Sequence, residues 1–125
     1  MTTLLYVDDE ETIGRAVQRV FSMRGDTALI ARSVAEAQEI LEREQPDIVF
    51  IDVWLGDESG FEILAWIEDF RPELARRVTF VTGEFVAYDD PHSVWSRLGR
   101  PVIQKPFDFK RLIDAVEDAG RADVA

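Results

Sequence analysis

The stretch Ile48-Val49-Phe50-Ile51-Asp52 decides the fold class. Four apolar residues, rich in β-branched and aromatic side chains, run directly into a single carboxylate. A short run that is apolar at every position is typical of a strand buried on both faces of a parallel sheet. Open α/β sheets bind their ligands beyond the carboxyl ends of the strands. Asp52 is therefore a candidate functional residue, although a loop carboxylate or a helix N-cap would look the same in the sequence.

Apolar runs of this kind recur along the chain and alternate with amphipathic, helix-like segments. Strands are expected at 4–7, 27–31, 48–51, 78–81 and 102–103. Helices are expected from about 11 to 23, 33 to 45, 60 to 71, 90 to 98 and from 108 onward. This alternation predicts an α/β, flavodoxin-like, doubly wound (βα)5 fold with a five-stranded parallel sheet. Periodicity does not fix the order of the strands, and 2-1-3-4-5 is the first choice by analogy with known doubly wound sheets.

Polar residues at the expected helix starts support these bounds. Ser33, with Glu36 three residues later, matches a capping box. Asp90 before Pro91 predicts an N-cap and a first helical residue. From Gly120 onward such signals are missing, and a frayed tail is expected.

Length and composition predict one globular domain. The chain has 125 residues, of which 46% are hydrophobic and 31% charged, and it has no cysteine. No apolar run approaches the roughly 20 residues that a membrane span needs, and the acidic run 8–11 interrupts the first apolar run too early for a secretory signal. The net charge of -11 argues against direct binding to nucleic acid. We therefore expect a cytoplasmic protein without membrane insertion.

Polar and charged side chains follow the central strands of the predicted sheet. They are Asp8 and Asp9 after the first strand, Asp52 after the third, Thr82 after the fourth, and Gln104 and Lys105 after the fifth. Singly, such residues also cap helices or form turns. Together at one sheet edge, three carboxylates need a cation, and an all-oxygen set suits Mg²⁺. With a lysine and a hydroxyl beside them, these groups are the parts that phosphoryl transfer to a carboxylate requires.

With these residues identified, the chain resembles the receiver domain of two-component response regulators over essentially its whole length. The resemblance rests on Asp8-Asp9, Asp52, Gly60, Thr82-Gly83 and Lys105-Pro106-Phe107. It implies a receiver domain over residues 1–120, followed by a short tail over 121–125. It also implies a phosphorylation-activated signalling switch of a two-component system or phosphorelay.

In such a switch, Asp52 would accept a phosphoryl group from a phosphohistidine in an Mg²⁺-dependent reaction. The resemblance implies a sensor histidine kinase or a histidine phosphotransfer protein as donor, and a downstream protein as target. It also implies a candidate homodimer face, made by the fourth helix, the fifth strand and the fifth helix. No output domain with catalytic activity is expected in this chain, so it is not expected to be an enzyme.

The resemblance assigns roles to the metal ligands. Asp9, Asp52 and the backbone carbonyl of Trp54 would hold Mg²⁺ directly, and Asp8 would act mainly through water.

The resemblance also assigns roles around the phosphoryl group. Lys105 would bind a phosphoryl oxygen and precede a cis bond to Pro106, and Thr82 would turn toward the phosphoryl group. Trp54 and Glu84 stand two residues beyond Asp52 and Thr82 and would modulate the phosphoryl lifetime. We hypothesise that the indole shields the acyl phosphate from water, although it would equally serve to cover the loop.

Three positions depart from the family pattern, namely Trp54, Gly56 and Val102. Gly56 stands where the family usually has proline, and Val102 stands where the family has its switch aromatic residue. Because a valine has no ring to swing between buried and exposed positions, the change is expected to pass through the segment 83–98 instead. Trp95 or Phe85 would be its mobile apolar element, although a residue of either kind is more often a plain packing residue.

Other assignments stay open. The chain resembles receivers of hybrid histidine kinases and would fit as one excised from such a protein, although Met1 directly before the first strand favours a short natural protein. An Mg²⁺-dependent phosphohydrolase would use Asp52 as nucleophile but would need a second carboxylate where Trp54 stands. A receiver-like interaction module that does not use phosphorylation is consistent with Val102.

Overall fold

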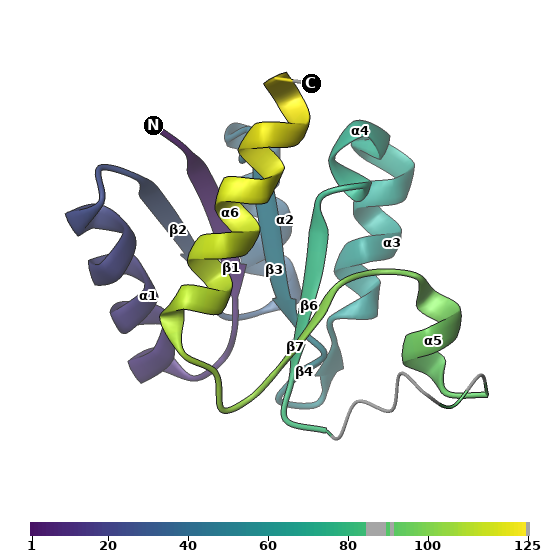
Figure 1. The fold of residues 1–125 in the computed structure, drawn as a ribbon. Coiled ribbons are helices and arrows are strands. Elements are labelled where there is room, and N and C mark those ends of the chain that lie inside the picture. The colour runs from purple at the N-terminus through teal and green to yellow at the C-terminus, as the bar shows by residue number, and fades with distance from the viewer. Residues whose placement is uncertain (85–89, 91, 125) are drawn as a thin grey trace.

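A five-stranded parallel sheet forms the centre of the molecule (Figure 1). The structure is a computed structural model that describes residues 1–84, 90 and 92–124, the last four by their backbone only. Across the sheet, the strands are β2 (Thr27–Ala31), β1 (Thr3–Val7), β3 (Ile48–Asp52), β6 (Val78–Thr82) and β7 (Val102–Gln104). Counted along the chain, these are the second, first, third, fourth and fifth sheet strands, so the predicted order is confirmed.

Helices cover both faces of the sheet. The first face carries α1 (Glu11–Met23) and α6 (Phe109–Val124), and the second carries α2 (Val34–Arg43), α3 (Phe61–Phe70) and α5 (Val94–Leu98). A short helix that the sequence did not predict, α4 (Pro72–Ala75), follows α3. Each layer of helices buries its apolar stripe against the sheet, which gives one core cluster for each face.

The position of β3 explains its sequence. Ile48 and Phe50 belong to the core cluster beneath α1 and α6, whereas Val49 and Ile51 belong to the cluster beneath α2 and α3. Successive strand residues point to opposite faces, and both faces are covered, so every position is apolar. Asp52, the last residue of β3, is only 6% exposed. The predicted buried strand that ends in a carboxylate is therefore confirmed.

The loop after β3 contains a small antiparallel hairpin that the sequence did not predict. Its strands are β4 (Trp54–Leu55) and β5 (Glu58–Ser59). Gly56 in the turn has a φ of +65°, a left-handed conformation that suits glycine. Proline cannot adopt it, because its ring fixes φ at about -65°. A proline at position 56 is therefore incompatible with this turn.

The start of α5 differs from the sequence-based expectation. The helix begins at Val94, because Ser93 is its N-cap and its hydroxyl accepts a hydrogen bond of 3.2 Å from a backbone N–H in the first turn. The Asp90 carboxylate instead accepts a hydrogen bond of 2.9 Å from the backbone N–H of His92. Asp90 thus forms a local turn ahead of the helix, and the predicted N-cap is wrong. Pro91 lies outside the described residues.

Two other helix ends were also predicted. The Ser33 hydroxyl accepts a hydrogen bond of 3.1 Å from the backbone N–H of Glu36, which confirms the predicted N-cap of α2. At the other end of the chain, the backbone is helical to Val124, so the frayed tail expected from Gly120 is wrong. The division into a domain over 1–120 and a tail over 121–125 stays a prediction. No described helix has the length and apolar composition that crossing a membrane would require.

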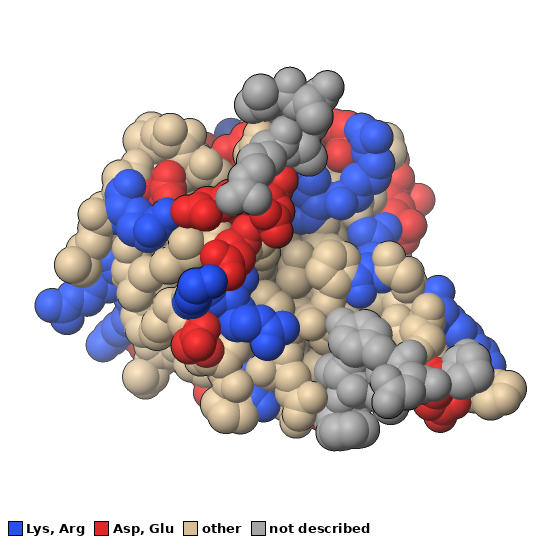
Figure 2. Space-filling view, viewed as in Figure 1, with Lys and Arg blue, Asp and Glu red and all other residues tan. Residues whose placement is uncertain are grey.

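The surface along α6 mixes charges of both signs. Figure 2 shows acidic and basic side chains next to one another there, in agreement with the ion pairs Arg24–Glu117 at 2.8 Å and Lys110–Asp114 at 2.9 Å. These pairs are exposed, so they contribute little to stability. The outer surface of α6 is therefore that of an ordinary solvated helix. The residues that the sequence singled out lie elsewhere, at the carboxyl ends of the strands.

Candidate functional site

The carboxyl ends of the strands bring together residues that are far apart in the sequence. Asp8 follows β1, Asp52 ends β3, Thr82 ends β6 and Lys105 follows β7. The ammonium nitrogen Nζ of Lys105 lies 2.9 Å from Asp8 Oδ2 and 2.9 Å from Asp52 Oδ2. The peptide bond between Lys105 and Pro106 is cis, as the resemblance implied. The predicted gathering of these groups at one sheet edge is confirmed.

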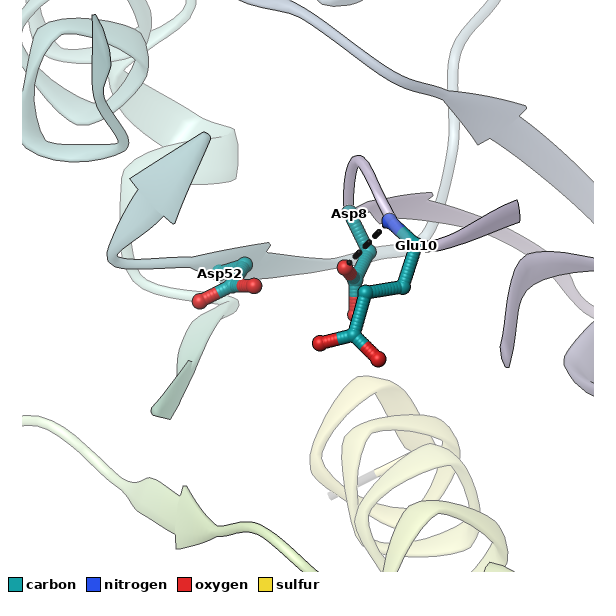
Figure 3. Close-up of side chains that lie close together, drawn as sticks. All are labelled: Asp8, Glu10 and Asp52. Atoms are coloured by element: carbon teal, nitrogen blue, oxygen red, sulfur yellow. Dashed lines mark hydrogen bonds between the residues drawn. The ribbon is translucent and has the colours of Figure 1, made fainter. Parts of the chain in front are cut away.

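Glu10 completes the charge cluster, although no pattern in the sequence singled it out. Its Oε1 lies 3.1 Å from Lys105 Nζ. Within the described ranges, Asp8, Glu10 and Asp52 form a group in which one carboxylate oxygen of each residue lies within 4.8 Å of those of the other two (Figure 3). Glu10 belongs to the acidic run 8–11, and periodicity cannot tell which members of such a run turn toward the site.

Asp9, which was expected to bind the metal directly, lies at the edge of this group. It is exposed and does not belong to the three-carboxylate cluster. Its side chain lines a cleft that opens over Asp52 and lies beside the β4–β5 turn, where its Oδ2 would be 4.0 Å from a Cβ atom added at Gly56. Direct metal binding by Asp9 and by the Trp54 carbonyl therefore stays a prediction.

Asp8 is fully buried and its carboxylate is held by three donors. The Tyr6 hydroxyl donates to Oδ2 at 3.0 Å, the backbone N–H of Glu10 donates to Oδ1 at 3.0 Å, and Lys105 is the third donor. Burial, together with the negative charge of Asp8, raises the pKa of Tyr6, so its hydroxyl keeps its proton. Tyr6 reads in the sequence as a core residue of the first strand, and its contact with Asp8 adds a role in fixing the site.

Burial raises the pKa of Asp52 from 3.8 to about 6, although the hydrogen bond and charge of Lys105 act in the opposite direction. The charge of Asp8 acts in the same direction as burial. Burial also lowers the pKa of Lys105, but the carboxylates of Asp52 and Asp8 outweigh it, so this pKa lies above its ordinary value. At neutral pH the lysine is therefore charged, and Asp52 is largely the ionised carboxylate that a nucleophile must be.

A cleft of about 280 Å³ opens over Asp52. Its other lining residues are Asp9, Glu10, Trp54, Gly83, Glu84 and Lys105. The indole N–H of Trp54 donates a hydrogen bond of 2.6 Å to the Glu84 carboxylate, and the backbone N–H of Trp54 donates one of 3.3 Å to Asp52 Oδ1. The two residues that the resemblance places beside the phosphoryl group are thus linked to each other at the cleft.

Thr82 lies next to this cleft but is fully buried. Its hydroxyl oxygen accepts a hydrogen bond of 3.0 Å from the backbone N–H of Glu84. The hydroxyl keeps its own hydrogen for donation while it accepts this bond. Thr82 therefore stabilises the start of the loop after β6 through its hydroxyl oxygen.

On the second face of the sheet, the aromatic rings near Val102 come from other elements. Val102 is buried in the core cluster that also contains Trp95 of α5. The ring of Phe61 lies 4.9 Å from that of Phe80 and 6.4 Å from that of Trp95, measured between centroids. Trp95 is therefore a packed core residue in this structure, and its motion on phosphorylation stays a prediction. Phe85 lies outside the described residues.

Comparison with known proteins identifies the family. The profile of the response regulator receiver domain matches residues 4–117. The chain therefore belongs to the response regulator receiver domain family, whose members are domains of two-component signalling proteins.

Three known proteins show how close the likeness is. The sensory transduction protein LytT of Enterococcus faecalis is 29% identical over 121 residues, which cover 94% of this chain and 48% of LytT, so the chain spans about half of that relative. A CheY-like receiver domain protein from Methanospirillum hungatei has a TM-score of 0.81 at 25% identity, covering 98% of this chain and 97% of the other. The response regulator TrrA of Thermotoga maritima, crystallised with Mg²⁺ and BeF, has a TM-score of 0.77 at 22% identity, covering 95% and 99%.

Proposed function

We propose that the chain is a phosphorylation-activated switch in which Asp52 accepts the phosphoryl group. The position of Asp52 carries this proposal: it ends a buried strand, lines an open cleft and lies 2.9 Å from Lys105 Nζ. A carboxylate with a cation beside it and a route of access is what a phosphoacceptor needs. With a phosphohistidine as donor, the N–P bond breaks, a bond forms between a carboxylate oxygen of Asp52 and phosphorus, and the electron pair of the broken bond stays on the imidazole.

Mg²⁺ is the proposed cofactor, and the donor set fits it. The carboxylates that line the cleft, those of Asp9, Glu10 and Asp52, present only oxygen donors, which suit a hard divalent ion better than a thiophilic one. We propose that Asp9, Asp52 and the Trp54 carbonyl hold the ion directly and that Asp8 acts through water. Bound there, the ion would neutralise negative charge on the phosphoryl oxygens.

Lys105 and Thr82 are the proposed partners of the phosphoryl oxygens. Lys105 remains charged at neutral pH, and it already contacts the Asp52 oxygen Oδ2. Thr82 ends the strand next to β3 and has a hydroxyl hydrogen to donate. A hydroxyl that turned toward the phosphoryl group would weaken its bond to the Glu84 N–H and so bias the loop after β6.

Trp54 and Glu84 are proposed to set the lifetime of the acyl phosphate. Their hydrogen bond holds the indole at the cleft that opens over Asp52. An indole fixed there would limit the approach of water to the phosphoryl group. The carboxylate of Glu84 is also occupied by this bond, which restrains it from orienting a water molecule for attack.

The proposed partners follow from the family. A sensor histidine kinase or a histidine phosphotransfer protein would supply the phosphoryl group, and a downstream protein would read the phosphorylated state. A homodimer through the face of α5, β7 and α6 is a candidate for that readout. Direct contact with nucleic acid is not proposed, because the chain carries a net charge of -11. The proposed location is the cytoplasm.

Beryllofluoride, which stands in for the phosphoryl group, tests this function together with Mg²⁺. Trp54 lines the cleft and is one of 3 tryptophans, so its fluorescence reports on the site, and Trp54→Phe identifies its share of the signal. We expect a saturable fluorescence change in the wild type and none in Asp52→Ala. No change in the wild type, or an equal change in Asp52→Ala, would contradict the proposal.

A further inference from the structure

All three N–H donors of the Lys105 ammonium group have an acceptor. A lysine offers three N–H donors. In this structure the three acceptors are Asp8 Oδ2 at 2.9 Å, Asp52 Oδ2 at 2.9 Å and Glu10 Oε1 at 3.1 Å. For Lys105 to bind a further phosphoryl oxygen, one of these acceptors has to leave or share its donor.

Glu10 is the acceptor that can leave. Asp8 is fully buried and is fixed by Tyr6 and by a backbone N–H, and Asp52 would itself carry the phosphoryl group. The Glu10 side chain is 58% exposed, and it makes no capping hydrogen bond at the start of α1. Within the described ranges, its carboxylate forms a hydrogen bond and ion pair with Lys105 only.

The pair Glu10–Lys105 lies between two clefts. Together with Gly83 it lines the acidic cleft over Asp52, and it also lines a larger, mainly apolar cleft of about 520 Å³. The remaining lining residues of the apolar cleft are Ile13, Pro106, Phe107 and Phe109. A carboxylate released from Lys105 would therefore remain beside a cleft formed by α1 and the segment that leads into α6.

We propose that Glu10 occupies the place of a phosphoryl oxygen on Lys105, and that phosphorylation of Asp52 displaces the Glu10 carboxylate toward the apolar cleft between α1 and α6. This inference rests on the proposed function of Asp52. The displacement carries the phosphorylation state to the face of α1 and α6 through a charged side chain. It therefore needs no ring at Val102.

Beryllofluoride affinity at saturating Mg²⁺ tests the first half of the proposal. Glu10→Ala removes the competing acceptor, and Glu10→Asp keeps the charge but shortens its reach. We expect both variants to bind beryllofluoride about twofold to fivefold more tightly than the wild type, as for the loss of an exposed ion pair. Glu11→Ala is the matched control, because it removes the same charge from an exposed side chain that pairs with Arg15 instead.

Direct competition of the Glu10 carboxylate with beryllofluoride for Lys105 and a long-range effect of negative charge on the affinity differ in their response to salt. At about 1 M salt the Debye length falls to about 3 Å, so any effect of Glu11→Ala should vanish while that of Glu10→Ala remains. Unchanged affinity in Glu10→Ala would overturn the proposal. The proposal would also fail if Glu10→Ala and Glu11→Ala gained affinity for beryllofluoride equally while Glu10→Asp kept the affinity of the wild type.

The methyl signals of Ile13, followed by NMR, test the second half. Beryllofluoride should shift them in the wild type and shift them much less in Glu10→Ala, because that variant has no carboxylate to displace. Equal shifts in both proteins would overturn the displacement toward the apolar cleft. If the wild type fails to bind beryllofluoride, or if Asp52→Ala binds it equally well, the proposed function of Asp52 fails instead.

Discussion

The indole N–H of Trp54 donates a hydrogen bond of 2.6 Å to the carboxylate of Glu84. The first residue follows β3 and the second follows β6, so this bond joins the loops beyond two neighbouring strands. Both residues line the cleft over Asp52. The bond thus fixes a ring that is 54% exposed at the entrance to a buried carboxylate.

Removing this ring should shorten the lifetime of the acyl phosphate. We expect Trp54→Asn to lose its phosphoryl group roughly threefold to tenfold faster than the wild type, which corresponds to about 0.7–1.4 kcal/mol in the barrier to hydrolysis. Trp54→Phe, which keeps a ring but lacks the N–H donor, should lie between them. The decay of the phosphorylated band in a phosphate-affinity gel, after removal of the donor, measures the rate.

The exposed Phe70 at the end of α3 provides a control for the loss of an aromatic surface residue. Phe70→Asn should leave the decay rate unchanged. A Trp54→Asn variant that dephosphorylates no faster than the wild type would rule out shielding by the indole.

Replacing Asp52 with a neutral residue should stabilise the fold at neutral pH. Because burial raises the pKa of Asp52 to about 6, folding favours its protonated form. The contribution of Asp52 to the free energy of unfolding is fully present below about pH 4 and is lost as the pH rises through about 6. Asp52→Asn has no ionisable group at this position and keeps its stability as the pH rises. Its free energy of unfolding should therefore exceed that of the wild type by roughly 1–3 kcal/mol at pH 7 and by much less at pH 4.

Urea denaturation without Mg²⁺ at several pH values between these limits measures the difference. Asp69→Asn, at an exposed position on α3, is the control for removing a surface carboxylate. A gap between Asp52→Asn and the wild type that stays constant from pH 4 to pH 7 would contradict the raised pKa.

Removing Lys105 should make the fold depend on Mg²⁺. Without its ammonium group, the buried carboxylates of Asp8 and Asp52 lose their common counter-charge. We expect Lys105→Met to lower the free energy of unfolding by about 3 kcal/mol at neutral pH. Mg²⁺ should restore much of this loss, because the ion would compensate the same carboxylates.

Thermal unfolding with and without Mg²⁺ measures both effects. Lys110→Met is the matched control, because Lys110 pairs with Asp114 on the surface and its side chain is 78% exposed. It should change stability little and show no extra response to Mg²⁺. If Lys105→Met and the wild type gain equally from Mg²⁺, the ion does not replace the counter-charge that Lys105 supplies to these carboxylates.

Adding a methyl group at Gly60 should disturb the phosphoacceptor directly. A Cβ atom there would overlap the backbone carbonyl oxygen of Asp52 and lie 2.7 Å from Ile51 Cγ2. We expect Gly60→Ala to destabilise the fold by about 2–4 kcal/mol and to slow phosphorylation, because the end of β3 has to move. Gly120→Ala, where a Cβ meets nothing within 4 Å, should be neutral or slightly stabilising. Equal stabilities of the two variants would contradict this contact.

The sequence predicted the features that depend on a pattern repeated over several residues. The four residues of β3 before Asp52 are apolar because both faces of the strand are buried, and the alternation of strands and helices predicted a parallel sheet. The order of the strands was taken by analogy with known doubly wound sheets. Asp52 and Lys105 were predicted to meet because parallel strands end at one edge. The first and the last of these inferences need only the type and succession of the elements, which periodicity reveals.

Features that depend on the path of a single loop were missed. Glu10 reaches Lys105 because the Glu10 N–H binds Asp8 Oδ1, and no periodicity encodes this contact. The β4–β5 hairpin has strands of two residues each, too short to show alternation. At the start of α5, two cap-forming residues stand three positions apart, and only the structure shows that Ser93 caps the helix while Asp90 forms a turn.

The measurement that bears most directly on Asp52 is mass spectrometry of the protein after incubation with acetyl phosphate and Mg²⁺. We predict a single phosphoryl group per chain, located in the peptide that contains Asp52 and removed by hydroxylamine, as an acyl phosphate should be. It should be absent in Asp52→Asn and when a chelator removes Mg²⁺. An unmodified wild type, or equal phosphorylation of Asp52→Asn, would contradict the proposed switch.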